Sequence, residues 1–350
     1  MHRLLIGVAA LLAACQPAPP RSPSWPDRSH VLEQARQVGS QGRTPEAAEV
    51  RPEALRIGYA QGGREDHLLS AWYAGVAGTH DHAPRLFALT GPESGDVVPI
   101  LPNHPEASRG RRLGAGGGER ATGRTVLKRI VRHDFDCGRA GAATFLEGAL
   151  KDAPVVALAR VPARNPDRAR MVLRRRPGLE EESLTEMKKR TFVVWEHDSF
   201  FRASAAQWLR GVGLAALVPR LSVRPSGESL TAYFEAGKAD YAFVVKGRRK
   251  DSDGARHGTV VDLKPEAFAA PELAQNLLVC RTDVVATHRR DLIELIARWR
   301  EKHPESAPQA VDEENLEVLM GLLRSAGVVS ATAPTHTLVD GALLREAEAL

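Results

Sequence analysis

Short apolar runs alternate with longer amphipathic segments along the chain from residue 54 onward. Apolar runs bounded by Gly, Pro or charged residues predict strands at 55–59, 84–90, 135–138, 154–161, 170–173, 190–195, 220–223, 241–245 and 275–280. Apolar residues at helical spacing predict helices at 66–76, 125–132, 144–150, 199–212, 228–236, 287–302 and 313–326. This alternation predicts an α/β protein whose sheets are mostly parallel.

Residues 91–124 interrupt the alternation. They are rich in Gly, Pro and Arg, which predicts a long loop or insertion. At its end, Gly118–Thr125 is one substitution away from the phosphate-binding pattern G-x-x-x-x-G-K-T. Arg124 replaces the lysine, and no strand is predicted before Gly118 to orient the backbone amides. A flexible Gly-rich loop is therefore the better interpretation.

Length and composition fix the class of protein. The chain has 350 residues, of which 43% are hydrophobic, enough for two domains or for one domain built as two lobes. A wholly disordered chain is excluded, and three cysteines are too few for a small disulfide scaffold. The net charge is +5, but the basic residues are scattered and not interleaved with aromatic ones. We therefore expect no nucleic-acid partner.

The N-terminus has the pattern of a secretion signal. A short basic start, Met1–Arg3, precedes the apolar run Leu4–Ala14, which is too short to span a bilayer. The run ends in Leu12-Ala13-Ala14-Cys15, which matches the lipobox of bacterial lipoproteins. We predict that residues 1–14 are removed and that Cys15 carries the lipid, a diacylglycerol with fatty acids such as palmitate. An ordinary signal peptide with an incidental cysteine is the alternative.

The segment after Cys15 is rich in proline, which predicts an extended tether over residues 15–53. Such a tether would hold a folded body on the periplasmic side of the cell envelope, anchored to a membrane by its lipid. Lipidation leaves Cys137 and Cys280. An oxidising compartment permits a bridge between them, but two buried free thiols are the favoured prediction.

Known catalytic and metal-binding patterns are missing from the sequence. It contains no G-x-S-x-G, H-E-x-x-H or C-x-x-C pattern. His80 and His82 have a spacing at which metals can bind, but no third ligand is in view, so a solvated turn is the better interpretation. The sequence therefore predicts no catalytic residue, no metal site and no cofactor, and the protein is not expected to be an enzyme.

The segment 194–201 joins a predicted buried strand to a predicted helix, with Asp198 or Ser199 as the N-cap. Ligands of open α/β sheets bind beyond the carboxyl ends of strands, so we predict ligand-binding residues here: Trp195, Glu196, His197, Asp198, Ser199 and Phe200. Free helix amides favour an anion, whereas Glu196 and Asp198 favour a cation. The charge of the ligand stays open, and a capped helix with Phe200 in the core is the alternative.

The order of these elements resembles type II periplasmic solute-binding proteins of ABC importers, in particular the branch that binds alkanesulfonates, nitrate or thiamine precursors. The resemblance covers about residues 54–302 and is carried by the segments 55–59, 135–140, 184–194, 209–214, 234–240 and 278–302. It implies two lobes with a hinge and a cleft between them. The predicted first lobe comprises 54–165 and 275–350, and the second comprises 166–274.

The resemblance also implies a binding pocket and a mechanism. The positions that match the family's pocket, besides Glu196–Phe200, are Tyr59, Gln61, Gly138, Ala140 and Lys246. The lobes would close on a small solute, and the closed form, a monomer, would be presented to the subunits of an ABC permease. Two alternatives are an extracytoplasmic enzyme or sensor on the same fold and a lipoprotein that scaffolds an envelope complex.

Overall fold

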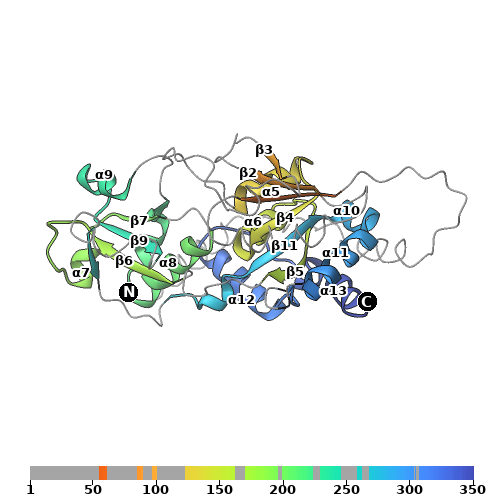
Figure 1. Cartoon of the computed structure of the whole chain (residues 1–350). Helices are drawn as coiled ribbons and strands as arrows, with labels where there is room; N and C mark the ends of the chain where they lie inside the picture. Colours follow the sequence, from red (N-terminus) through yellow and green to blue (C-terminus); the bar gives the residue numbers. More distant parts are fainter. Residues whose placement is uncertain are drawn as a thin grey trace, which may run out of the picture.

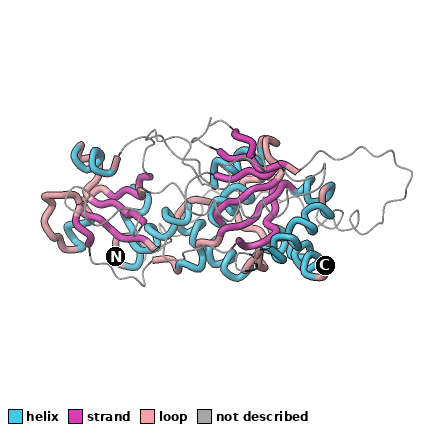
Figure 2. Tube along the Cα trace, viewed as in Figure 1, coloured by secondary structure: helices cyan, strands magenta, loops and turns pink. Residues whose placement is uncertain are grey.

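The computed structural model describes residues 55–60, 85–89, 97–100, 123–161, 170–195, 199–223, 229–245, 258–261, 268–302, 304 and 307–350. Several predicted features lie outside these residues: the signal peptide, Cys15, the tether up to residue 53, Gln61, the helix 66–76, His80, His82, Glu196, His197, Asp198 and Lys246. The described chain forms two sheets with helices around them, and Figures 1 and 2 show the strands as two separate groups.

The first sheet has six strands in the order β3-β2-β1-β4-β11-β5. Strands β1, β2, β4 and β5 run in one direction, while β3 and β11 run antiparallel to their neighbours. The bounds are β1 Arg56–Ala60, β2 Arg85–Leu89, β3 Val97–Ile100, β4 Cys137–Gly141, β5 Val155–Val161 and β11 Asn276–Arg281. The last strand of the chain is thus inserted between two strands that come from its first half.

The second sheet has five strands in the order β10-β6-β9-β7-β8. Strands β7, β8 and β9 are parallel, whereas β6 is antiparallel to both β9 and β10. The bounds are β6 Met171–Arg175, β7 Phe192–Val194, β8 Ser222–Val223, β9 Tyr241–Val245 and β10 Thr259–Val261. Every described strand of this sheet comes from the middle of the chain.

Nine α-helices surround the sheets in the described part of the chain: α5 Gly123–Val131, α6 Ala142–Ala149, α7 Leu184–Met187, α8 Ser199–Gly211, α9 Leu230–Glu235, α10 Thr282–Thr287, α11 Arg289–Lys302, α12 Glu313–Ser325 and α13 Gly341–Glu348. Three short 3-10 helices are η2 Ala215–Arg220, η5 Pro271–Leu273 and η7 Thr335–Thr337. Among the described residues, no helix has the length and apolar character needed to cross a membrane.

The α/β class is confirmed, with three corrections to the predicted elements. Strand β3 lies inside the segment 91–124, for which a loop was predicted. The sheets are mixed, because the antiparallel strands β3, β6 and β11 separate or flank the co-directional ones. The short strand β10 and the short helices α7, α10 and α13 were not predicted, because three to eight residues are too few for an apolar period to be recognised.

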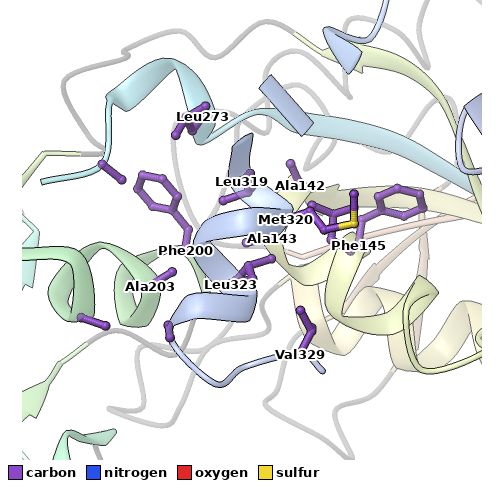
Figure 3. Packing of buried hydrophobic residues seen from close by; sticks show 14 of the residues in the cluster. Ala142, Ala143, Phe145, Phe200, Ala203, Leu273, Leu319, Met320, Leu323 and Val329 are labelled. Carbon is purple, nitrogen blue, oxygen red and sulfur yellow. The ribbon is translucent and has the colours of Figure 1, made fainter. Parts of the chain in front are cut away.

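One continuous apolar cluster connects the two sheets. It includes Leu277 and Val279 of the first sheet and Leu173 and Phe243 of the second. Helices α6, α8 and α12 contribute the side chains between the sheets, and Figure 3 shows these residues packed around α12: Phe145, Phe200, Ala203, Leu319, Met320 and Leu323. The outer face of the first sheet packs against α11 and α13, and that of the second sheet packs against α9.

Cys137 and Cys280 form a disulfide, so the favoured prediction of two free thiols is wrong. The residues face each other across the antiparallel pair β4 and β11, with Cα atoms 4.0 Å apart. Both are fully buried. The two cysteines are 143 positions apart in the sequence, so only the strand register reveals that they are neighbours.

Candidate functional site

The candidate site lies at the edge of the first sheet where β1, β2 and β4 end. These three strands are parallel, so their carboxyl ends meet at one edge. Strand β11 is antiparallel to them and begins at this edge, with Asn276 opposite Gly141. Ligands of open α/β sheets bind at this kind of edge.

Two helices begin beside the end of β4. Helix α6 follows β4 directly, and the preceding residue, Gly141, caps it with no side-chain hydrogen bond. Helix α5 begins at Gly123, so close that a Cβ atom there would lie 3.2 Å from the Cα atom of Ala140. Neither helix has an acidic residue in its first turn. The partial positive charges of both N-termini therefore face the same region without a carboxylate of their own helix to oppose them.

Gln275 completes this edge. Its backbone carbonyl accepts a hydrogen bond from the backbone N–H of Ala142, at 2.8 Å. Its side chain is only 6% exposed, and both the Nε2 and the Oε1 atom are buried without a hydrogen-bond partner. Sequence reasoning missed this residue, because the unpaired state of the amide depends on the register between β4 and β11.

A second polar group joins the helices of the two sheets. Arg124 of α5 donates through Nη2 to Glu147 Oε2 of α6, at 2.5 Å, and to Ser199 Oγ of α8, at 2.9 Å. The Ser199 hydroxyl donates to the same carboxylate, and Lys151 Nζ donates to Glu147 Oε1 at 3.0 Å. Glu147 of α6 is thus the shared acceptor of three residues, which come from α5, from α8 and from the turn after α6.

The electrostatics of this group favour an ionised Glu147. Burial alone would raise the pKa of its carboxyl group. The hydrogen bonds from Ser199 and Lys151, together with the charge of Arg124, outweigh burial and hold the pKa of Glu147 below its usual value of 4.5. At neutral pH the carboxylate is therefore charged and paired.

Comparison with known proteins identifies the fold. No family model and no curated protein sequence matches the chain. A solved structure, the ligand-binding component of an ABC-type import system from Staphylococcus aureus with zinc bound, matches with a TM-score of 0.53 and 9% identity over 84% of this chain and 99% of that one. The chain has the fold of an ABC-importer binding protein. The predicted two-lobed α/β architecture is thereby confirmed.

Two further solved structures match with lower TM-scores. The periplasmic aliphatic sulphonate binding protein SsuA from Escherichia coli has a TM-score of 0.44 and 15% identity over 82% of this chain and 77% of its own. PhnD1 from Prochlorococcus marinus, solved with methylphosphonate, has a TM-score of 0.47 and 10% identity over 80% of this chain and 100% of its own.

Within this binding-protein fold, Gly138 and Ala140 lie beneath α5 and α6. A Cβ atom at Gly138 would lie 2.4 Å from Val126 Cγ1 and 2.6 Å from the carbonyl oxygen of Gly58, so only glycine allows α5 and β1 to pack this closely. Ala140 is 1% exposed and belongs to the apolar cluster between the sheets. Tyr59 is on the neighbouring strand β1, opposite Ala88 of β2.

Trp195, Ser199 and Phe200 lie at the second sheet. Trp195 is 6% exposed and packs edge-on against Tyr233 of α9, with ring centroids 5.6 Å apart. Phe200 is buried in the cluster around α12 (Figure 3). Its ring contacts that of Phe201 edge-on, with centroids 5.4 Å apart. The burial of Phe200 in this cluster is what the alternative of a helix whose first turn enters the core predicts.

Asp136, part of a segment that carries the family resemblance, lies at the opposite edge of the first sheet. Its carboxylate accepts from the backbone N–H of Arg56 at 2.8 Å and pairs with Arg281 at 3.3 Å. Burial alone would raise the pKa of Asp136, but the hydrogen bonds and charges of these arginines lower it below 3.8. This side chain ties the amino end of β1 to the carboxyl end of β11, away from the candidate site.

The described residues offer no site for a metal ion. Within the ranges that the structure describes, no three His, Cys, Asp or Glu side chains are grouped so that they could hold one. The polar groups beside the starts of α5 and α6 are backbone amides and the amide of Gln275, which can bind a ligand by hydrogen bonding.

Proposed function

We propose that this protein is a lipid-anchored solute-binding protein that captures a small organic or ionic solute outside the cytoplasm and delivers it to the permease subunits of an ABC importer. One observation carries the proposal beyond the fold: the first turns of α5 and α6 lie side by side at the carboxyl end of β4. Uncapped backbone amides at such an edge suit the polar head of a small ligand.

Two features support an extracytoplasmic location. The first fourteen residues have the pattern of a signal peptide that ends before Cys15. The buried disulfide between Cys137 and Cys280 is of the kind that forms in oxidising compartments. In this proposal Cys15 carries the lipid, residues 15–53 are the tether, and the folded body is a monomer.

The proposed mechanism is closure of two lobes. The strands of the first sheet come from both ends of the described chain, and those of the second come from its middle, which supports lobes of residues 54–165 with 275–350 and of residues 166–274. The connections between the sheets then act as hinges. Closure is stabilised only by contacts that the solute makes with both lobes, so the solute must bind the closed form more tightly.

The proposed pocket combines the carboxyl edge of each sheet. From the first sheet it takes Tyr59 and Gln61, and from the second it takes Glu196–Ser199 and Lys246. Gly138, Ala140, Trp195 and Phe200, which the sequence also assigned to ligand binding, would form the packed floor and walls. No residue of this pocket is proposed to act as a catalyst.

The proposal is tested by thermal-shift screening of the chain from residue 16 onward against a broad panel of solutes. We expect at least one small molecule to raise the melting temperature, because a ligand that binds only the folded state stabilises it in proportion to RT ln(1 + [L]/Kd). Calorimetry then gives the Kd of the hit. No response across the panel would overturn the proposal, and turnover of the stabilising compound would show an enzyme instead.

A further inference from the structure

Gln275 is the most unusual polar residue at the candidate site. Only 6% of this residue is exposed, and neither Nε2 nor Oε1 of its side chain has a hydrogen-bond partner. A buried amide without partners loses its hydrogen bonds to water and gains none in the protein, which destabilises the fold. Such a cost at a ligand-binding edge needs an explanation, because buried polar groups in folded proteins are otherwise almost always paired.

The strand register shows which way this amide faces. Opposite residues of an antiparallel pair share a face, and Leu277 lies opposite Ala140, both in the cluster beneath α5 and α6. Gln275 stands two residues before Leu277 and is hydrogen-bonded through its carbonyl to Ala142 at the start of α6. Successive side chains along a strand point to opposite faces of the sheet, so residues two apart share a face. The side chain of Gln275 is therefore on the same face as that of Leu277, where α6 begins.

The first turn of α6 offers unused donors on that face. The N–H of Ala142 is bonded to the carbonyl of Gln275, whereas the N–H groups of the next two residues have no intrahelical acceptor. Gly141 supplies no side chain to cap them. A ligand oxygen placed here would accept hydrogen bonds from the helix and from Gln275 Nε2 together.

We propose that Gln275 is a ligand-binding residue that selects small oxyanions carrying a neighbouring hydroxyl or amino group. Nε2 and the first turn of α6 bind a carboxylate, sulfonate or phosphonate oxygen, and Oε1 accepts from the neighbouring donor. The two amide atoms are adjacent, so the acceptor and the donor must be adjacent in the ligand as well. This inference rests on the proposed solute-binding function, because it assigns Gln275 to the site at which that solute would bind.

The test uses three pairs of acids that differ by one hydroxyl group: glycolate and acetate, 2-hydroxyethanesulfonate and ethanesulfonate, and hydroxymethylphosphonate and methylphosphonate. We expect the wild type to bind the hydroxylated member of at least one pair about tenfold or more tightly. In Gln275→Met, which removes both polar atoms at similar volume, binding of that acid should weaken about 10- to 100-fold and the preference for the hydroxyl group should disappear.

Gln207→Met is the matched control. Gln207 on α8 also has a buried Oε1 atom without a partner, but α8 belongs to the second sheet. Its substitution should leave both the affinity and the preference unchanged. An unaltered or raised melting temperature of unliganded Gln275→Met would show that the variant is folded.

Three results would overturn the inference. If Gln275→Met keeps the affinity and the hydroxyl preference of the wild type, Gln275 does not contact the ligand, although the receptor function stands. If a solute of the broad panel binds but none of the six acids does, the assigned ligand class is wrong. If Gln207→Met loses binding equally, the effect is not specific to the edge of the first sheet.

Discussion

Cys137 and Cys280 are directly opposite each other on the neighbouring strands β4 and β11, and their disulfide joins these two strands of the first sheet. The bridge joins a strand from the first half of the chain to the last strand, and β4 leads directly into α6 at the candidate site. A covalent link at this position fixes the register that places Gln275 beside the first turn of α6.

Removal of this disulfide should destabilise the protein without unfolding it at room temperature. Closure of a loop of this length is worth about 2–5 kcal/mol, mainly through the unfolded chain. The double variant Cys137→Ala with Cys280→Ala should therefore lower the free energy of unfolding by about that amount in urea titrations. The wild type without Cys15 should show no free thiol when unfolded in the absence of reductant; two reactive thiols would contradict the bridge.

Glu147→Gln should weaken the contact between α8 and the helices of the first sheet. The substitution removes a charged acceptor shared by Arg124, Ser199 and Lys151. Hydrogen bonds to a charged group are worth about 1.5–3 kcal/mol, so a loss of about 1–3 kcal/mol in unfolding free energy is expected at pH 7. Lys151→Ala is the control, because this exposed pair should contribute less than about 0.5 kcal/mol.

The same contact should depend on pH in one direction. The pKa of Glu147 is lowered on folding from its usual value of 4.5. Its stabilisation is therefore fully present above pH 4.5 and is lost as the pH falls through the lowered value. The stability difference between wild type and Glu147→Gln should be constant from pH 6 to 8 and should shrink below about pH 4.5 in denaturant titrations. A difference that grows on acidification would contradict the paired carboxylate.

Gly138→Ala should be strongly destabilising. The added Cβ atom would come within 2.4 Å of Val126 Cγ1 and 2.6 Å of the Gly58 carbonyl oxygen, and the backbone oxygen cannot move aside as a side chain can. Overpacking of this kind costs about 1–3 kcal/mol or more. Gly321→Ala is the opposite case, since Gly321 lies within α12 with no atom near its missing Cβ. Thermal unfolding should show Gly321→Ala to be stabilised by about 0.5–1 kcal/mol.

Cys15→Ala tests the proposed anchor. In cells that process lipoproteins, the wild type should partition with membranes, and mass spectrometry of its N-terminus should give Cys15 with a diacylglycerol and a further acyl chain. The variant should appear in the soluble extracytoplasmic fraction, since the apolar run Leu4–Ala14 is too short to hold it in a bilayer. A wild-type chain that is cleaved elsewhere and carries no lipid would support the ordinary signal peptide.

The elements that could be predicted from sequence are those with their own apolar signal. The near-continuous aliphatic runs of β5 and β9 and the helical spacing of Leu316, Leu319 and Leu323 in α12 are visible without any tertiary context. Strand β3 was missed because its four residues include Pro99 and lie within a Gly-rich stretch. Its backbone is extended because it pairs with β2, not because of local propensity.

The place of the candidate site could be suggested from sequence, but its composition could not. The family resemblance assigned Tyr59, Gly138 and Ala140 of β1 and β4 to the pocket, and the rule that ligands lie at the carboxyl edge of parallel strands assigned Trp195–Phe200; both assignments stay predictions. Gln275 and the neighbouring starts of α5 and α6 depend on the antiparallel insertion of β11, which the sequence does not encode locally. Similarly, the partnership of Glu147 with Ser199 joins residues 52 positions apart on helices of different sheets.

The position of β11 also constrains how the protein is made. Because β11 lies between β4 and β5, the first sheet cannot close until more than three quarters of the polypeptide has left the ribosome. In a partly synthesised chain, β4 and β5 are therefore already present while β11, which lies between them in the finished sheet, is still missing. In the export proposed for this protein, that delay suits a polypeptide that stays unfolded during translocation. Truncation after β10 would leave β4 and β5 without the strand that lies between them, and would not merely shorten the protein at its end.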